Sequence, residues 1–290
     1  MNEEIAACRL RITRRRALVA GGSVALGALL TGCGLGRGSA GDTVDVVTST
    51  GETTTVAPTT SMAAGDDLAL TLLDGARSCQ MTTEETQGPY WFDVDSIRSD
   101  IREDRPGARL DLVLRVQDVS GCSAGGAAHP VPDAVVEIWH CDAGGIYSGF
   151  ESSSRGAGGG GLGGGQPSDG SYSEGESQAT TTDDGTFLRG AQVAGADGIV
   201  RFTTIYPGWY RGRTVHIHLK VHLDRSTVLT SQLYFDESLN SAVFATSPYD
   251  ERTDRDTFND GDGIFDESGM LTTRATDDGH LAVINLGIDV

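Results

Sequence analysis

One stretch of the chain carries most of its information: residues 204–218 read TIYPGWYRGRTVHIH. The end of this stretch alternates like a β-strand, in which successive side chains point to opposite faces. His216 and His218 therefore share one face, about 6.5 Å apart along the strand, close enough to bind one metal ion. The opposite face reads as core, with Val215, Ile217, Leu219 and Val221. A phenolate is a hard oxygen ligand suited to a high-valent metal, so the tyrosines of this stretch argue against a plain zinc site.

The composition describes an acidic protein that is long enough to bury a sizeable core. The chain has 290 residues, a formal net charge of −19, 40 glycines and a single lysine, Lys220. Binding to phosphate groups needs clustered cations, so this charge balance argues against nucleic acid as a partner. Acidity of this kind keeps an exported protein in solution.

The first 33 residues are typical of an export signal rather than of a fold. Residues 13–19, TRRRALV, resemble a twin-arginine signal, and the weakly apolar run that follows is too short and glycine-rich to span a membrane comfortably. Residues 30–33, LTGC, resemble a lipobox, in which Cys33 is lipidated. The alternative is an ordinary signal peptide with a chance cysteine. We therefore expect export by the twin-arginine route and a lipid anchor on Cys33, which places the protein on the outer face of the cytoplasmic membrane or outside the cell.

After this signal (residues 1–33) the chain divides into a spacer and one folded domain. Residues 34–66 are rich in Gly, Ser, Thr and Ala and have too few large apolar side chains to fold, which predicts a flexible low-complexity linker. Residues 67–290 predict an all-β domain, a β-sandwich of mostly antiparallel strands whose long loops build the metal site. The expected strands are 110–116, 134–139, a hairpin of 186–193 and 198–205, then 214–222, 229–235 and 281–290, with a helical turn at 236–245.

Two further features of the domain stay open at this stage. Cys79, Cys122 and Cys141 remain in an oxidising compartment and allow one disulfide, but the sequence does not show which pair forms it. The glycine-rich run 156–165 is a flexible loop rather than a phosphate cradle, because no Lys-Ser/Thr follows it. It either overhangs the site or is a plain surface insertion.

Four segments, taken in their order and spacing, resemble the intradiol ring-cleavage dioxygenases, the family of the catechol and protocatechuate dioxygenases. They are residues 86–91 (TQGPYW), 136–148 (VEIWHCDAGGIYS), 187–190 (FLRG) with 198–202, and 207–218. The resemblance covers residues from about 79 to 265 and has the form of the secreted single-domain branch, without a long helical dimerisation segment. Gln87 stands where that family usually has a glutamate.

The resemblance implies a mononuclear Fe(III) site and assigns its parts. The implied metal ligands are Tyr147, Tyr210, His216 and His218. The implied catalytic residues are Arg213, Tyr210 and Gln232. In this scheme Tyr210 is the ligand that leaves the metal when substrate binds, and it then takes up a substrate proton.

Elementary chemistry agrees with these implied roles. Two phenolates and a hydroxide neutralise a ferric ion, and two neutral imidazoles complete a five-coordinate shell. Arg213 is permanently cationic and suits negative charge that develops on the substrate. The resemblance implies an oxidoreductase that uses O2 to cleave a catechol-type diol between its hydroxylated carbons, giving a cis,cis-muconate-type diacid. The sequence leaves open which catechol is used, and also the oligomeric state, a homodimer included.

Two other classes of protein remain as alternatives. A superoxide dismutase-like metal-binding sandwich would need about six histidines and an aspartate in one cluster, whereas only His216 and His218 lie together here. A non-catalytic binding module would not require the tyrosine, arginine and histidine set. Among the remaining residues, Tyr206 is the alternative to Tyr210 as the second tyrosine ligand, and Tyr90 is expected to line the wall of the pocket. The others read as core or structural positions: Trp139, His140 and His222.

Overall fold

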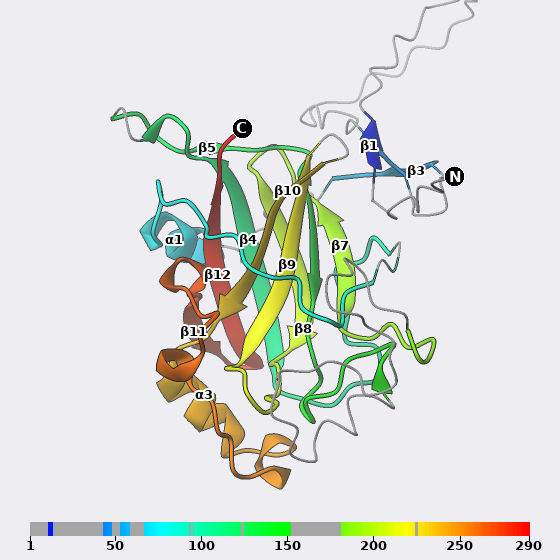
Figure 1. Ribbon diagram of the computed structural model, residues 1–290. Helices are drawn as coiled ribbons and strands as arrows, with labels where there is room; N and C mark the ends of the chain where they lie inside the picture. The colour runs from blue at the N-terminus through cyan, green and yellow to red at the C-terminus, as the bar shows by residue number, and fades with distance from the viewer. Residues whose placement is uncertain are drawn as a thin grey trace, which may run out of the picture.

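The structure is a computed structural model (Figure 1). It describes residues 11–13, 43–47, 53–58, 67–92, 94, 96–122, 125–151, 181–223 and 226–290. The proposed signal residues around the arginine run, Cys33 and the glycine-rich loop 156–165 lie outside this part of the chain. Among the residues that are described, no helix is long and apolar enough to cross a membrane.

The domain consists of two β-sheets stacked face to face, which confirms the predicted all-β sandwich (Figure 1). The first sheet is antiparallel throughout and has the order β10 (Ser226–Tyr234), β9 (His216–Leu223), β6 (Val135–Trp139), β7 (Arg189–Val193). The second has the order β11 (Thr272–Thr276), β12 (Gly279–Ile288), β4 (Arg109–Asp118), β5 (His129–Pro130), with β8 (Ile199–Ile205) also paired to β4. Only the β12–β4 pair of this sheet is parallel.

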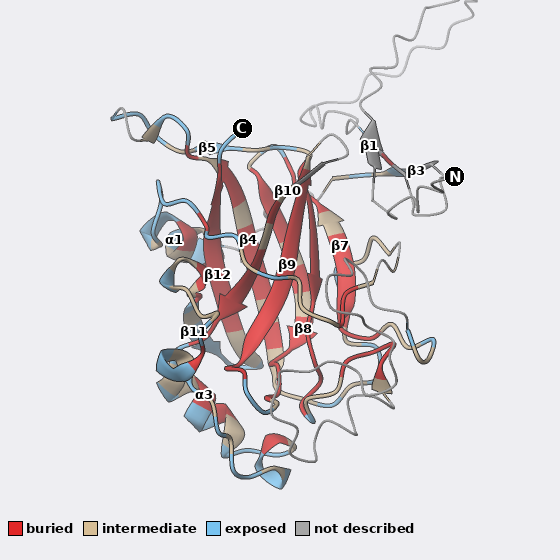
Figure 2. Cartoon of the chain, in the orientation of Figure 1, coloured by how far each residue is buried: buried red, intermediate tan, exposed pale blue. Residues whose placement is uncertain are grey.

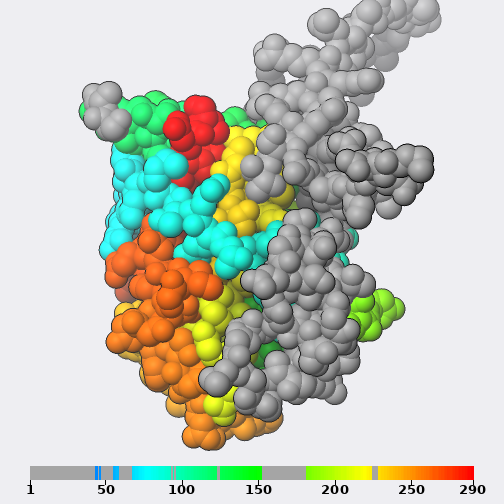
Figure 3. All heavy atoms as spheres, in the orientation of Figure 1, coloured from blue at the N-terminus to red at the C-terminus, as the bar shows by residue number. Residues whose placement is uncertain are grey.

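The helices lie outside the two packed sheets, one of them on the outward face of the second sheet. They are α1 (Asp67–Gly75) and α3 (Glu237–Phe244), followed by the 3-10 turns η2 (Tyr249–Glu251), η3 (Asn259–Gly261) and η4 (Glu267–Gly269). The segment after α1 and the segment around η4 lie side by side at the surface, cyan and orange in Figure 3. An ion pair of 3.1 Å between Arg77 and Glu267 joins them. The helical turn that the sequence predicts at 236–245 is the short helix α3, and the Asp236 side chain caps its N-terminus.

The inward faces of the two sheets form one apolar core (Figure 2). In β4 the leucines of the alternating pattern are fully buried, and they face the inward residues of β6 and β9. The core residues from these three strands include Leu110, Leu112, Leu114, Val136, Ile138, Ile217, Leu219 and Val221. Each such side chain stabilises the fold by about 1.5–3 kcal/mol relative to leaving it exposed.

The outward face of β9 is buried as well, although it carries polar residues. Its residues His216, His218, Lys220 and His222 are all less than 9% exposed. The covering segment is 86–92: Gly88 lies against the His218 ring and Lys220 Nζ lies 3.2 Å from the centre of the Trp91 ring. This cover turns the outer face of the first sheet into the floor of an enclosed site.

The predicted hairpin of residues 186–193 and 198–205 is wrong. Both strands exist, but β7 pairs with β6 in the first sheet and β8 pairs with β4 in the second. The connection crosses from one sheet to the other, and it turns at Gly198, whose φ is +73°. A Cβ at Gly198 would collide with the Val116 carbonyl, so only glycine fits this crossing.

Several smaller features of the fold were not predicted from the sequence. Helix α1 buries Ala69 and Leu73 against the second sheet, and β11 is a polar edge strand. A separate sheet of β1 (Arg11–Thr13), β2 (Val44–Val47) and β3 (Thr53–Val56) includes two strands inside the predicted linker 34–66. Val44 and Val46 of β2 are buried against Val135 and its neighbours on β7.

The disulfide left open by the sequence joins Cys79 to Cys122, with Cα atoms 5.5 Å apart. It ties the segment after α1 to the loop that follows β4. Cys141 is a buried free thiol.

Candidate metal centre and active site

Four side chains from two loops and one strand bring their donor atoms to one point. The Nε2 atom of His216 lies 3.1 Å from Nε2 of His218, 3.1 Å from the Tyr210 hydroxyl and 3.4 Å from the Tyr147 hydroxyl. These are the four residues that the sequence predicted as metal ligands. The structure therefore places all four together.

The separations suit a shared metal ion better than a hydrogen-bond network. Two ligand atoms about 2.0–2.1 Å from a metal, at angles of about 90–110°, lie about 2.9–3.4 Å apart. The observed distances of 3.1–3.4 Å fall in this range. His216 Nε2 has a single lone pair and can accept a hydrogen bond from only one of its three neighbours, whereas a cation between the four atoms satisfies all of the contacts.

The histidines are held neutral, as metal ligands must be. Burial lowers the pKa of His216 and of His218 well below the ordinary value. His216 Nδ1 lies 2.7 Å from the carbonyl oxygen of Thr214, so it donates its proton there and leaves the Nε2 lone pair free for a metal. The His218 ring is stacked on Trp139, with centroids 4.9 Å apart and planes at 3°.

Tyr147 lies on a loop whose shape is fixed by Asp142. The Asp142 carboxylate accepts hydrogen bonds from the backbone N–H groups of Gly144 and Ile146, 2.9 and 3.0 Å away. The Tyr147 ring is 1% exposed and stacks on Tyr90 at 4.7 Å. Burial raises the pKa of Tyr147 well above its ordinary value.

Tyr210 lies on the loop between β8 and β9 and is only partly buried. Gly208 brings this loop against the Tyr147 loop: its N–H donates to the Asp142 carbonyl at 3.1 Å, and a Cβ at Gly208 would collide with the carbonyls of Asp142 and Ala143. Burial raises the pKa of Tyr210 to about 12. Both phenols therefore keep their protons until a cation replaces them.

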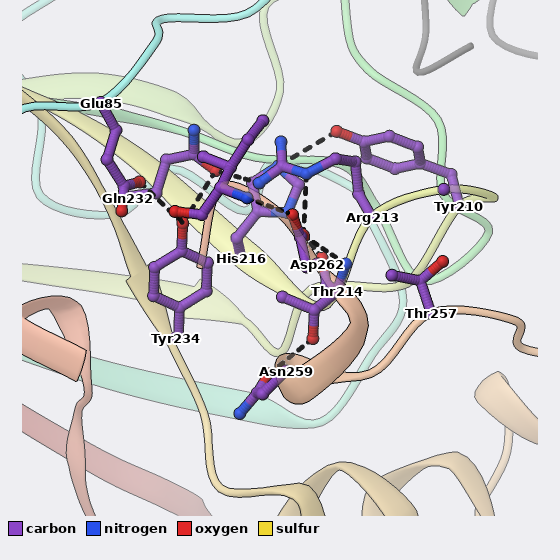
Figure 4. Close-up of polar contacts among 12 residues, drawn as sticks. Glu85, Tyr210, Arg213, Thr214, His216, Gln232, Tyr234, Thr257, Asn259 and Asp262 are labelled. Carbon is purple, nitrogen blue, oxygen red and sulfur yellow. Dashed lines mark hydrogen bonds and ion pairs between the residues drawn. The ribbon is translucent and has the colours of Figure 1, made fainter. Parts of the chain in front are cut away.

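Arg213 lies beside this cluster and is held from two sides (Figure 4). Its Nε donates to Asp262 at 2.8 Å and its Nη2 donates to the Gln232 side-chain oxygen at 2.6 Å. The Gln232 side-chain N–H group in turn donates to the Thr86 carbonyl at 3.0 Å. Burial opposes the Arg213 cation, but Tyr210 and Asp262 outweigh that effect and hold its pKa above the ordinary value. The sequence predicted Arg213 and Gln232 at this site, but not Asp262.

A second carboxyl group that the sequence did not single out also belongs to this network. Glu85 accepts a hydrogen bond of 2.7 Å from the Tyr234 hydroxyl, which lies 3.5 Å from the Gln232 oxygen (Figure 4). Burial raises the pKa of Glu85 to about 7. Its position directly before the motif of residues 86–91 was the only signal in the sequence.

The residues judged structural from the sequence are buried away from the donor cluster or support it. Tyr206, the rival ligand, donates its hydroxyl to Asn240 at 2.7 Å in the core. His140 contacts the Cys141 carbonyl and the Thr204 hydroxyl, each at 2.8 Å, and burial lowers its pKa to about 4. His222 lies 3.5 Å from the carboxylate of Glu137.

The fold and the four donors define a class: a β-sandwich protein in which two tyrosines and two histidines bring their donor atoms together beneath the loops. No protein-family model matches the chain. An intradiol ring-cleavage dioxygenase from Tetranychus urticae is 32% identical, with a TM-score of 0.61, over 73% of this chain and 95% of that one. The dioxygenase domain of a carbohydrate-binding fusion from Streptomyces sp. SirexAA-E is 26% identical over 73% of this chain and 99% of its own, with a TM-score of 0.47.

A chlorocatechol 1,2-dioxygenase from Rhodococcus opacus is also similar. It is 24% identical over 180 residues, which are 53% of this chain and 56% of that protein. The chain thus matches little more than half the length of this curated relative. Given the 32% identity to the Tetranychus urticae protein and the 95% coverage of that protein, the chain belongs to the intradiol ring-cleavage dioxygenase family.

Proposed function

We propose that this protein is a non-haem Fe(III) enzyme that cleaves catechol-type diols with O2 between the two hydroxylated carbons, giving cis,cis-muconate-type diacids. The observation that carries the proposal is the meeting of the Tyr147, Tyr210 and His218 donor atoms at His216 Nε2, within 3.1–3.4 Å. Membership of the intradiol family supports it.

The donor set fits a ferric ion. Two hard phenolate oxygens and two imidazole nitrogens suit a trivalent, oxygen-preferring metal, and two negative charges offset most of its charge. When bound, Fe(III) supplies a Lewis-acidic centre that holds both oxygens of the diol and permits its reaction with O2. His216, His218 and Tyr147 are the buried members of the set, so we assign them the permanent hold on the metal.

Tyr210 and Arg213 act on the substrate. Tyr210 is the more exposed of the two phenols, so we assign it the role of the ligand that leaves the metal and whose phenolate oxygen takes up a diol proton. The Arg213 guanidinium is fixed by Asp262 and Gln232, so its positive charge is already oriented when negative charge develops on the substrate oxygens. Gln232 holds this arginine through its side-chain oxygen, while its own N–H group donates to the Thr86 carbonyl.

A single-domain enzyme tethered at the cell surface meets varied catechols from outside the cell. We propose breadth, with catechol and ring-substituted catechols turned over within about a hundredfold in kcat/KM, a spread of about 3 kcal/mol. The test is a product assay with iron-loaded enzyme under air, on catechol and on catechols with methyl, chloro and carboxylate substituents. Formation of the muconate-type diacid is expected; a yellow semialdehyde, cut beside the two hydroxyl groups, would overturn the proposed function. Strict dependence on a substrate carboxylate would overturn the proposed breadth.

We also propose an exported, lipid-anchored location, with the lipid on Cys33 as the attachment to the membrane. The twin-arginine pattern and the lipobox support this, because they stand next to each other in the sequence. Cys33→Ser should release the protein or leave it unprocessed, and replacing Arg14 and Arg15 by lysine should block export. Wild-type protein found free in the medium, with an N-terminus other than Cys33, would contradict the anchor.

A further inference from the structure

Tyr147 differs from the two histidines in what holds it. His216 and His218 lie on β9, in the middle of an antiparallel sheet. Tyr147 lies on the loop that follows β6, where turns replace the hydrogen-bond ladder of a strand. A ligand must stay within about 0.5 Å of its productive position, so side chains around the loop have to supply the constraint that a sheet supplies for the histidines.

Arg189, at the start of β7, supplies such a constraint. Its Nε donates to the Ser148 hydroxyl and its Nη2 donates to the Ser148 carbonyl, each at 2.8 Å. The Ser148 hydroxyl donates in turn to the Phe187 carbonyl at 2.6 Å. The residue next to Tyr147 is therefore fastened to the sheet by three hydrogen bonds, two of which come from one planar fork.

Arg189 is a buried cation, and removing a charge from water raises the free energy of the folded protein unless nearby groups compensate for it. Its side chain is 2% exposed, and within the described part of the chain it forms no ion pair with a carboxylate. Its Nη1 has no hydrogen-bond partner there either. Burial lowers the pKa of Arg189 to about 9, so the guanidinium is still charged at neutral pH. The centre of the Phe92 ring lies 4.2 Å from the guanidinium carbon, and Glu137 and Asp183 favour the Arg189 cation, but the groups that accept its hydrogen bonds at close range are those of Ser148.

We propose that Arg189 is the positioning residue for Tyr147: its forked donation to Ser148 fixes the loop so that the Tyr147 hydroxyl points at the metal site. The proposal rests on the proposed function only for the identity of the metal. Tyr90 stacks on the Tyr147 ring, and Arg189 holds the backbone that follows it.

The test compares three variants. Arg189→Lys keeps the charge but loses the fork. Ser148→Ala removes only the hydroxyl and should fold even if the arginine variant does not. Arg98→Lys is the matched control, because Arg98 also donates to carbonyls around β7, those of Arg189 and Thr186 at 2.9 and 2.6 Å, without touching Ser148. Wild type and variants are compared in iron dissociation, measured by chelator competition, and in the visible absorption band of the iron-loaded protein. In the metal-free protein, the same set is compared in hydrogen exchange of the backbone amides of 144–150.

We expect Arg189→Lys and Ser148→Ala to lose iron about tenfold faster, to shift the visible band and to exchange the 144–150 amides several-fold faster, with Arg98→Lys like wild type. Wild-type exchange in 144–150 for both folded variants would overturn the proposal. So would equal acceleration of that exchange in Arg98→Lys. A wild-type protein that takes up no iron would instead contradict the proposed function, and the exchange measurement would still decide whether Arg189 fixes the loop.

Discussion

The two histidines of the centre differ in the contact made by the second ring nitrogen. His216 Nδ1 is engaged by the Thr214 carbonyl, whereas His218 Nδ1 has no hydrogen-bond partner in the described part of the chain and its ring is held by stacking on Trp139. One hydrogen bond therefore orients the His216 ring, whereas packing against Trp139 orients the His218 ring. Neither contact could be predicted from the spacing of the histidines alone.

Removing a histidine and removing Tyr210 should have different consequences. His216→Ala opens the buried metal shell, so we expect loss of iron and of colour together. Tyr210→Phe removes the more exposed ligand, so it should keep some iron, shift the visible band and slow substrate binding, because the base for the diol proton is gone. Iron content and absorption spectra of the two purified variants check this. Full iron content with an unchanged spectrum in Tyr210→Phe would contradict its place in the shell.

Arg213 should matter for turnover and not for the metal. Arg213→Ala is expected to keep the iron and its colour but to lower kcat by about 100- to 1000-fold, which corresponds to about 3–4 kcal/mol of charge stabilisation. Asp262→Asn, which weakens the hold on Arg213, should lower kcat by about tenfold. Steady-state kinetics on iron-loaded protein measures both. Near-wild-type kcat in Arg213→Ala would show that this arginine does not act on the substrate.

Glu85 should make stability depend on pH. Burial raises its pKa from 4.5 to about 7, so between these values the folded protein binds more protons than the unfolded chain. The free energy of unfolding should therefore fall as pH rises from about 4.5 to 7, by about 1–2 kcal/mol for this half-buried group. Urea unfolding at pH 5 and pH 8 should show a smaller fall in Glu85→Gln than in wild type, whereas Glu84→Gln, a change at an exposed neighbour, should behave like wild type. An equal fall in all three would contradict the assignment.

At the scale of elements, the alternating strands were predictable because one face of each is buried in the core. The pattern of Leu110, Leu112 and Leu114 marks β4 directly. Pairing was less predictable: the glycine-containing turn before Gly198 looks like a hairpin, and only the packing of the two sheets shows that the chain crosses between them. The polar edge strand β11 offers no apolar alternation, and α1 is too short to show a clear period.

The residues of the site also differ in how far the sequence predicts them. Tyr147, Tyr210, Arg213 and the two histidines were predictable because they stand in motifs with fixed spacing. Asp262 reaches the site from a loop far away in the sequence, and no local pattern distinguishes it from the many other acidic residues of the chain. Glu85 has only its place directly before the motif of residues 86–91 to distinguish it. Arg189 stands in a quoted motif, but its contact with Ser148 depends on how β7 lies against the Tyr147 loop.

The disulfide joins two segments of the chain that are not paired with each other in a sheet. Cys79 and Cys122 are 43 residues apart, so their link restricts the unfolded chain substantially. Replacing both by serine should lower the free energy of unfolding by about 2–4 kcal/mol while leaving the visible spectrum of the iron-loaded protein unchanged, because the bond lies away from the donor cluster. Chemical denaturation with a matched spectrum checks this; a shifted visible band in the folded double variant would show that the link shapes the site.

At the scale of the whole molecule, negative charge dominates the chain while the site keeps its cations buried. The net charge is −19, yet Arg189, Arg213 and Lys220, the single lysine, are all less than 9% exposed beneath the loops that cover the first sheet. Of these cations, Arg213 lies close enough to Tyr210 to act on its pKa, and the acidic remainder of the chain contributes to solubility. This separation of charge is a property of the fold, because it depends on the cover formed by segment 86–92.

We propose that Tyr147, Tyr210, His216 and His218 together hold one ferric ion. The metal content and the visible absorption spectrum of the purified protein, recorded before and after addition of catechol under nitrogen, test this assignment. We predict one iron per chain and a red colour from tyrosinate-to-Fe(III) charge transfer. We also predict a change of the visible band when catechol is added. A colourless protein containing zinc, or a blue-green one containing copper, with no spectral response to catechol would contradict it.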